Sequence, residues 1–321
     1  MNTQKEIQEL FNTYCKNHSF KGSPQELYDP INYILGLGGK RLRPVLMLLS
    51  AQLFGDAMAK VLPAAFAIEV FHNFSLVHDD IMDNAFLRRG KEATHIKYST
   101  SAGILSGDVM LIYAYQYLSS YNNIELLNIF NQLAIDVCEG QQYDMNFETQ
   151  EHVSLDAYMK MIELKTAALI AGAMKIGAMI GGANEEEANN VYEFGRNIGI
   201  AFQLQDDILD SFGDAKKFGK KIGGDIIQNK KTYLILKSLE IAPEDKRLEL
   251  EKWMKNNTSD EQTKIKSVTK IFRDLAIEVH AHQAKEKYLQ LAIESINKIN
   301  CAETRKGILK SIAIGLANRD N

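Results

Sequence analysis

The chain has 321 residues, of which 45% are hydrophobic and 24% charged, and its net charge is −4. This composition is ordinary for a globular protein with a sizeable core, and the slight excess of acid argues against nucleic acid as a partner. Cys15, Cys138 and Cys301 are too widely spaced for a disulfide framework or a metal knuckle. We therefore expect a protein of a reducing compartment, the cytoplasm, and the lack of a long apolar run predicts no membrane span.

Long helices are favoured along the whole chain. None of the five prolines lies between Pro63 and Pro243, and apolar residues recur at helical intervals with no alternating strand pattern. We predict an all-α fold with a single domain over residues 1–321. The expected helices, in chain order, cover residues 3–17, 24–36, 44–54, 58–83, 100–120, 123–146, 154–182, 184–211, 225–240, 244–256, 258–297 and 303–318.

A glycine turn followed by cations is the first motif of chemical interest, Gly38-Gly39-Lys40-Arg41-Leu42-Arg43-Pro44. Pro44 predicts a helix start, and helix N-terminal N–H groups with Lys and Arg side chains form an anion site. Any one basic pair alone is read as solvated surface charge, and for Lys165 alone we favour that interpretation. The further basic clusters along the chain are Arg88-Arg89-Gly90, Lys165-Thr166, Lys220-Lys221 and Lys230-Lys231-Thr232.

Two acidic pentads repeat one pattern, Asp79-Asp80-Ile81-Met82-Asp83 and Asp206-Asp207-Ile208-Leu209-Asp210. Residues four apart share a helix face, so the first and last carboxylates of each pentad project side by side. A single pentad is about as easily a solvated acidic face, but each of these follows an apolar helical run. Because clustered carboxylates repel one another unless a cation lies between them, and Mg²⁺ prefers such oxygen ligands, we predict a Mg²⁺–diphosphate site.

These motifs resemble those of the trans-isoprenyl diphosphate synthases, or polyprenyl synthetases, of the short-chain geranylgeranyl or farnesyl type. The resemblance implies the isoprenoid synthase fold, a helical bundle around a deep central cavity, and a homodimer. It also implies a Mg²⁺-dependent prenyltransferase that joins isopentenyl diphosphate to dimethylallyl, geranyl or farnesyl diphosphate and releases diphosphate. The other matching stretches, in the order of the family, are His72 to Asp83 with Leu87-Arg88-Arg89-Gly90, Ser106-Gly107-Asp108, Lys165-Thr166, Phe202 to Asp210, and Phe218-Gly219-Lys220 with Gly223-Gly224-Asp225-Ile226.

The resemblance also assigns roles to individual residues. Lys40, Arg43, His72 and Arg89 would hold isopentenyl diphosphate; Asp79, Asp83, Asp206 and Asp210 would bind three Mg²⁺ ions; Arg88, Lys165, Lys220 and Lys230 would grip the allylic diphosphate; and Thr166 and Gln203 would lie at the reacting allylic end. Arg88, Lys165, Thr166 and Gln203 are thereby the candidate catalytic residues.

Several neighbouring residues have supporting or open roles. We expect Asp80 and Asp207 to support the metal ligands, Asp144 to order metal-bound water, and His78 and His95 to act behind the ligands or as caps. Many family members have a proline after the late lysine that Asn229-Lys230-Lys231-Thr232-Tyr233-Leu234 lacks, which leaves open whether Lys230 or Lys231 faces the phosphate.

Product length is predicted from the residues that precede the first pentad. Phe74 is the fifth residue before Asp79, Phe71 is the eighth, and Ser75, the fourth, is small. An aromatic at the fifth position only resembles archaeal-type geranylgeranyl synthases, so C20 is favoured over C15. A medium- or long-chain synthase, a class I terpene cyclase and a non-catalytic subunit are the alternatives; both pentads together with Lys40 argue against the last two.

Overall fold

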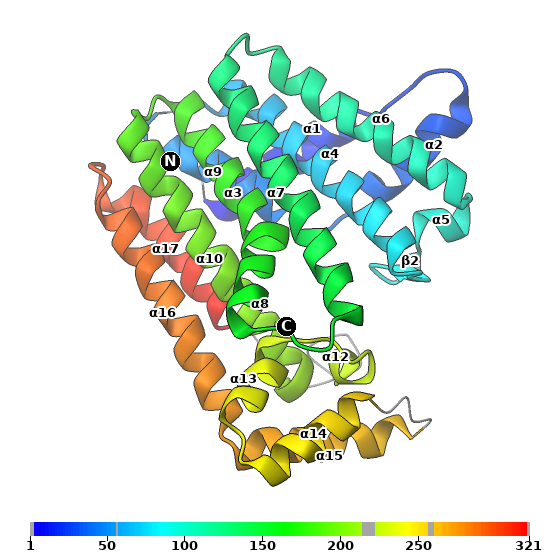
Figure 1. Ribbon diagram of the computed structural model, residues 1–321. Coiled ribbons are helices and arrows are strands. Elements are labelled where there is room, and N and C mark those ends of the chain that lie inside the picture. Colours follow the sequence, from blue (N-terminus) through cyan, green and yellow to red (C-terminus); the bar gives the residue numbers. More distant parts are fainter. Residues whose placement is uncertain (1–2, 56, 214–221, 256–259, 320–321) are drawn as a thin grey trace. The chain divides into compact units, whose positions relative to one another are not determined.

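The computed structural model describes residues 3–55, 57–213, 222–255 and 260–319 (Figure 1). Most of these residues are helical, which confirms the predicted all-α fold. The chain divides into two compact units, and each is described by itself: the first comprises Met1–Ala134, Leu169–Tyr192 and Lys298–Leu309, and the second Ile135–Ala168, Glu193–Asn297 and Lys310–Asn321. The helices are α1 (Gln4–Asn17), α2 (Gln25–Gly36), α3 (Leu42–Gln52), α4 (Met58–Met82), α5 (Thr94–Lys97), α6 (Thr100–Ser119), α7 (Ile124–Thr149), α8 (Leu155–Ile162), the π-helical η1 (Glu163–Ala167), α9 (Ala168–Gly181), α10 (Glu185–Phe212), α12 (Gly224–Ile227), α13 (Tyr233–Ile241), α14 (Glu244–Lys255), α15 (Glu261–Asp274), α16 (Ile277–Asn297) and α17 (Glu303–Ala317).

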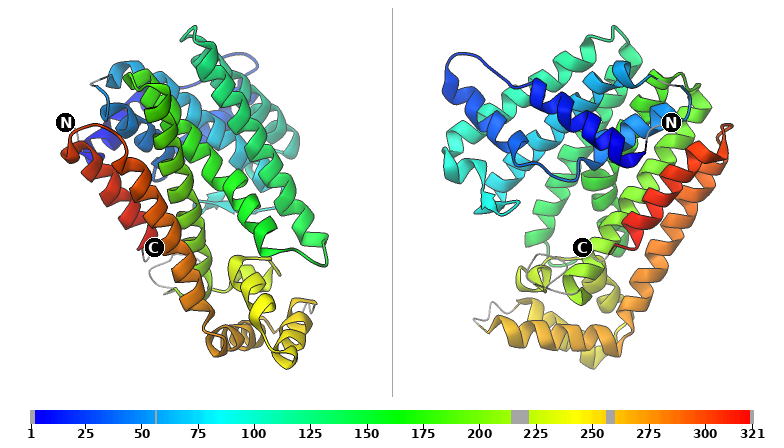
Figure 2. Two further views of the ribbon diagram at one scale, coloured as in Figure 1. Left: turned by 60° about the vertical axis from the view of Figure 1, so that its left-hand side comes forward. Right: turned by 180° about the vertical axis from the view of Figure 1, so that it is seen from behind.

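In the first unit, α4 is the central helix. It packs against α3 and α6, with α1, α2 and α5 around it, and α1 lies along α3 in the rear view of Figure 2. Phe66, Ile68 and Val70, on different faces of α4, are all fully buried. A helix that is apolar all round is expected at such a central position, so the two ends of α4 are the places where polar groups become accessible.

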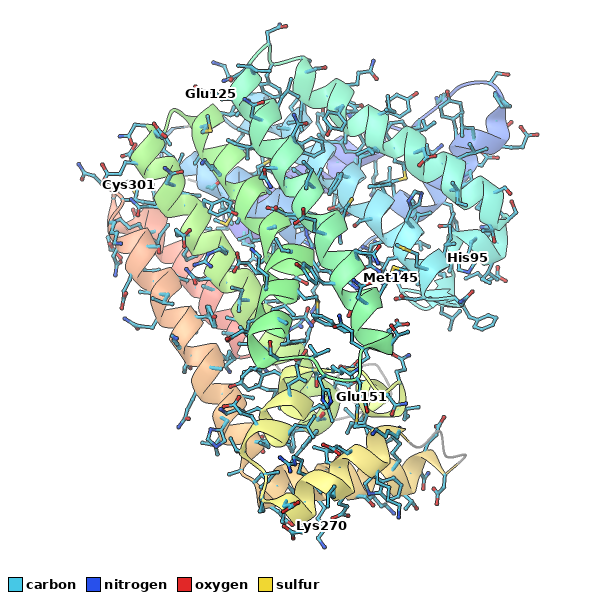
Figure 3. All side chains as sticks on the ribbon, viewed as in Figure 1. His95, Glu125, Met145, Glu151, Lys270 and Cys301 are labelled. Atoms are coloured by element: carbon cyan, nitrogen blue, oxygen red, sulfur yellow. The ribbon has the colours of Figure 1, made fainter. Side chains whose placement is uncertain are left out.

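In the second unit, the core gathers side chains of α8, α10, α13, α15 and α16, including the buried Leu204, Leu234 and Phe272. α13 packs against α8 and α16, and α15 contacts α12, α14 and α16. Exposed charged residues such as Lys270 project from the outer face of α15 (Figure 3). The carboxyl-terminal half of α10, which carries the acidic pentad, is thereby anchored in this core through Leu204 and Ile208.

The structure interrupts two helices that the sequence predicts as continuous. The expected helix over 258–297 ends at Asp274, because Ala276 takes a positive φ of 52°, a conformation unusual outside glycine. The expected helix over 225–240 is likewise two helices, with Asn229 at φ 57° between them. In each case a non-glycine residue makes the turn, so no glycine or proline marks it in the sequence.

The sequence analysis also missed a short β-hairpin, the single-turn helix α5 and the π-helical turn η1. β1 (Leu87–Arg88) pairs antiparallel with β2 (Lys91–Glu92). Arg89 and Gly90 between them both have positive φ, the pattern of a tight two-residue hairpin turn. Strands of two residues are too short to show alternation, and the single turn of α5 is too short to show a helical period.

Two helical stretches, Met58–Met82 and Leu155–Gly181, are long and apolar enough to cross a membrane by length and composition. The sequence analysis, which predicted no membrane span, did not identify these two stretches. Most of each apolar window is buried inside the structure, 61% and 67% respectively, as in a core helix of a globular protein.

Candidate active site

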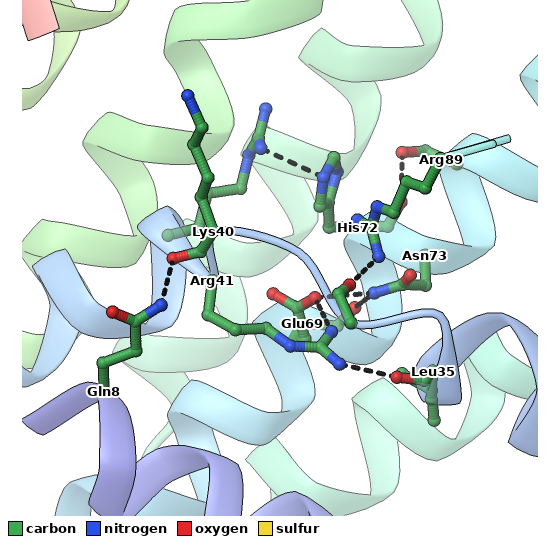
Figure 4. Close-up of polar contacts among 11 residues, drawn as sticks. Gln8, Leu35, Lys40, Arg41, Glu69, His72, Asn73 and Arg89 are labelled. Atoms are coloured by element: carbon green, nitrogen blue, oxygen red, sulfur yellow. Dashed lines mark hydrogen bonds and ion pairs between the residues drawn. The ribbon is translucent and has the colours of Figure 1, made fainter. Parts of the chain in front are cut away.

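The glycine turn of the first unit directs its cations to different places. Arg41 has a positive φ of 50° and turns inward, where it pairs with the buried Glu69 and donates to the Leu35 carbonyl (Figure 4). Lys40, next to it, remains exposed. α3 begins at Leu42, two residues before the helix start predicted at Pro44. The turn therefore uses one of its three cations as a structural anchor.

The remaining predicted isopentenyl diphosphate ligands come together beside this turn. Arg43 Nη1 lies 3.1 Å from His72 Nε2, and Arg89 donates to the Gly38 carbonyl. Burial, then the charge of Arg43, holds the pKa of His72 well below its usual value. Burial likewise lowers the pKa of Arg43 to about 10. An incoming anion would offset the repulsion between the neighbouring guanidinium groups of Arg43 and Arg89, so this part of the unit is a candidate diphosphate site.

Gly39 makes this arrangement possible. A Cβ at Gly39 would lie 2.8 Å from Cζ of Arg89, and the residue has a φ of 129° that side chains disfavour. The guanidinium of Arg89 occupies the space that a Cβ would take, and the positive φ is the stronger constraint because it is strained for any residue with a side chain. This is a physical reason for a glycine at that point of the motif.

The first pentad closes α4, as predicted. Asp83 is the C-cap, and its N–H donates to the Asp79 carbonyl over 2.9 Å. Asp80 is fully buried and accepts from Arg88 Nε at 3.0 and 3.1 Å, while Arg88 Nη2 lies 3.7 Å from Asp79 Oδ2. Asp80 thereby holds the Arg88 guanidinium next to Asp79; its support of the metal ligands stays a prediction.

In the second unit, Asp207 ties three segments together. Its carboxylate accepts from the Tyr158 hydroxyl, from the Tyr233 N–H at 3.1 Å and from Gln203 Nε2 at 3.2 Å. Gln203 Oε1 in turn accepts from the Thr166 hydroxyl at 3.3 Å. Burial raises the pKa of Asp207 to about 7. The two residues expected at the reacting allylic end are therefore linked to each other and to Asp207.

The outer carboxylates of the second pentad have different neighbours. Asp210 accepts from the Asp225 N–H at 3.1 Å, which fixes the start of α12. Asp206 pairs with Arg319, whose guanidinium lies 4.0 Å from the Phe202 ring centroid. Sequence reasoning gave no role to Arg319 or to Tyr158, and nothing in their surroundings in the sequence signals one.

Lys165 and Thr166 lie in the π-helical turn η1. Its backbone is packed between two glycines: a Cβ at Gly140 would lie 2.3 Å from the Lys165 nitrogen, and one at Gly199 would lie 2.6 Å from Ala167 Cα. Lys165 Nζ donates to Asp144 over 2.5 Å. Single π-helical turns are frequent at functional sites, and here the turn places adjacent polar side chains next to Gln203 and Asp144.

The two late lysines have different environments. Lys231 donates to the Phe147 carbonyl, and burial lowers its pKa. Lys230 is about half exposed, 3.9 Å from Asp225. Lys231 is thus held by the backbone of α7, which leaves Lys230 as the better candidate for a phosphate. Lys220 lies outside the described residues.

The three residues predicted to set chain length lie on α4 of the first unit. Phe71 is fully buried, and its ring contacts Phe74 at 5.5 Å and Phe130 of α7 at 5.2 Å. Phe74 is only partly buried. Ser75 donates to the His72 carbonyl. Phe74 is therefore the outer member of an aromatic stack whose inner members are Phe71 and Phe130.

The carboxylate donors fit Mg²⁺ by their chemistry. Within the described residues, no three His, Cys, Asp or Glu side chains form a ready-made metal cage. Mg²⁺ needs none, because it typically takes one or two carboxylates and completes its octahedron with water and phosphate oxygens. Asp79 with Asp83, and Asp206 with Asp210, supply one such pair in each unit.

Comparison with known proteins agrees with this geometry. The family model described as Polyprenyl synthetase matches residues 24–272. A geranylgeranyl diphosphate synthase of Sulfolobus acidocaldarius is 37% identical over 302 residues, 92% of this chain and 91% of that protein. One from Methanosarcina mazei is 41% identical over 222 residues, 68% of each. A crystal structure of a geranylgeranyl pyrophosphate synthase, 44% identical, superposes with a TM-score of 0.95 over all of both chains. The chain belongs to the polyprenyl synthetase family.

Proposed function

We propose that this protein condenses isopentenyl diphosphate with dimethylallyl, geranyl or farnesyl diphosphate and releases an all-trans C20 diphosphate. The observation that carries the proposal is the group formed by Arg43, His72 and Arg89 beside the pentad-bearing helix α4. A terpene cyclase has no use for a second diphosphate site. The similarity to two geranylgeranyl diphosphate synthases supports the same substrates and product length.

The residues divide the work as follows. Lys40, Arg43, His72 and Arg89 bind the diphosphate of isopentenyl diphosphate and orient its double bond. Arg88, Lys165 and Lys230 bind the allylic diphosphate and stabilise the charge that develops as it leaves. We assign Lys220 to the same group.

Asp79, Asp83, Asp206 and Asp210 would hold Mg²⁺, with three ions proposed for the loaded enzyme; when bound, the metal would supply positive charge to the leaving diphosphate. Thr166 and Gln203 line the allylic end. The new C–C bond leaves a tertiary cation on the isopentenyl unit, and the departing diphosphate accepts the proton that this cation loses from an adjacent carbon. The reaction requires that water be kept from the chain-binding space, because water would otherwise trap the cation.

Chain length follows from Phe74 in this proposal. An allylic chain that grows along α4 away from Asp79 meets Phe74 about 7.5 Å down the helix axis and Phe71 about 12 Å down it. The small Ser75 leaves the approach to Phe74 open, so the floor stands one residue deeper than if an aromatic occupied that place. C20 therefore fits better than C15, and products of C30 or more do not fit.

We further propose a cytoplasmic homodimer whose chains each act as one domain over residues 1–321. In the first unit, Leu105 and Ile112 lie seven residues apart on one face of α6 and are 58% and 65% exposed, and Ile124 at the start of α7 is 68% exposed. An exposed apolar face of this kind is typical of a subunit contact. Gel filtration with light scattering measures the oligomeric state directly.

The test is incubation with labelled isopentenyl diphosphate and each allylic primer, with Mg²⁺, followed by product analysis. We expect C20 diphosphate from all three primers and no cyclic hydrocarbon. Phe74→Ala should lengthen the product. Wild-type products of C30 or more, or an unchanged distribution in Phe74→Ala, would refute the floor, and cyclic products would favour a cyclase.

A further inference from the structure

Helix α6 packs against α4 and presents two glycines, Gly103 and Gly107, to α4 side chains. A Cβ at Gly103 would lie 3.0 Å from Cδ1 of Ile81, the tip of a flexible side chain. A Cβ at Gly107 would lie 2.3 Å from Nε2 and 2.6 Å from Cδ2 of His78. The two glycines lie four residues apart on one face of α6, and at Gly107 the space that a side chain would take is filled by an imidazole.

The His78 ring is held against the backbone of α6. Its Nε2 lies 3.2 Å from the carbonyl oxygen of Ile104 and 3.9 Å from Oδ1 of Asp108. Because a carbonyl can only accept, Nε2 carries the hydrogen and donates it. His78 thus binds the α6 backbone one turn before Gly107.

The same ring supports Phe74. The two residues are one helical turn apart on α4, and their rings meet edge to face, with centroids 4.8 Å apart. Phe71 contacts the Phe74 ring from the adjacent turn. Phe74 is therefore confined between a buried ring, Phe71, and a ring that α6 holds in place.

We propose that His78 is a positioning residue for product length, and that Gly107 acts through it by making room for its ring. The inference rests on the proposed function, since it assumes that Phe74 is the floor of the chain-binding space. A floor ring limits chain length only if it cannot rotate aside when the growing chain presses on it. Without the imidazole, Phe74 gains the volume that His78 occupies and can yield to one further isoprene unit.

The experiment compares the ratio of C25 to C20 products from farnesyl diphosphate in four variants. His78→Ala removes the support and should raise the ratio about two- to tenfold, the range that the loss of one edge-to-face aromatic contact permits. Gly107→Ala displaces the ring and should raise the ratio in the same direction. The double variant His78→Ala/Gly107→Ala should match His78→Ala, because the added methyl group then meets no ring. Gly103→Ala, the matched control, adds a methyl group to the same helix face and should keep the wild-type ratio.

Thermal unfolding and the separate KM values for the two substrates accompany each variant, because a merely structural role would lower stability without changing product length. If His78→Ala does not fold, His78→Gln serves instead, since its amide Nε2 can take the place of the ring Nε2 as donor to the Ile104 carbonyl but offers Phe74 no ring. A wild-type ratio in folded His78→Ala or His78→Gln, while Phe74→Ala lengthens the product, overturns the inference and leaves the proposed function standing. An unchanged product in Phe74→Ala refutes the floor itself, and the inference with it.

Discussion

Replacing Gly140 by alanine tests whether the tight packing around η1 matters for catalysis. The new Cβ would lie 2.3 Å from the Lys165 nitrogen and 2.6 Å from its Cα, where ordinary contacts begin at 3.4 Å. Both atoms are backbone, so no side chain can swing away, and η1 has to move by about 1 Å. Overpacking of this kind costs about 1–3 kcal/mol of stability.

The displaced turn carries Lys165 and Thr166, so turnover should suffer more than folding. A misplacement of about 1 Å in a positioned catalytic group can cost about 100-fold in rate. We expect kcat to fall about 100-fold, with near-normal circular dichroism and a modest loss in Tm. Gly315→Ala on α17 is the control, because a Cβ there meets nothing within 4 Å and kcat should not change. Wild-type kcat in folded Gly140→Ala would refute the claim that this packing positions Lys165.

Three further predictions address the metal, the diphosphate site and acid stability. Asp79→Ala and Asp206→Ala should each lower kcat about 100-fold or more and weaken Mg²⁺ binding measured by calorimetry. Tm should change little, since these carboxylates would bind the metal rather than fill space in the core. Near-normal activity at ordinary Mg²⁺ would contradict the metal assignment. Lys40→Ala should raise KM for isopentenyl diphosphate about tenfold or more and leave KM for the allylic substrate within about twofold, because a charged hydrogen bond is lost at one site only; the reverse pattern would mean that the two sites are exchanged. The pKa of His72 is depressed in the fold, so the unfolded chain binds the extra proton and the free energy of unfolding should decrease as pH drops below 6.5. Urea titrations between pH 7 and 5 should show a flatter dependence of this free energy on pH in His72→Asn. An equal slope in both proteins would show that His72 is not the cause.

The sequence predicted the features that depend on residue type and local spacing. Helices such as α4 and α10 follow from long apolar periodicity without proline, and the carboxylates of each pentad follow from a four-residue interval. The structure adds where the helices stop: the turns at Asn229 and Ala276 use positive φ at residues that seldom adopt it. Tertiary packing pays for that strain, and a single sequence carries no sign of it.

The sequence also could not predict which polar residues far apart in the chain contact each other. The expected support from Asp80 takes the form of an ion pair with Arg88, only eight residues away. Asp207 instead recruits Tyr158 and Tyr233, 49 and 26 residues away, and no local pattern joins them. The expectation that Asp144 orders water stays a prediction, although its pairing with Lys165 places it next to the group that it would serve.

Glycine explains how these helices position chemistry so closely. A side chain at Gly107, Gly140 or Gly199 would overlap an atom of the segment opposite: the His78 ring, the Lys165 backbone or the Ala167 backbone. Glycine inside a helix costs about 0.5–1 kcal/mol relative to alanine, so each of these positions is retained at a loss in helix stability. In return, the facing group can lie close to the glycine-bearing helix and is held rigidly there. Long flexible side chains could not hold it in this way, because their conformational freedom would have to be lost each time a substrate binds. The glycines therefore contribute to the position of the reactive groups, because they have no side chain. Small substitutions at these glycines should alter rate and product length before they unfold the protein.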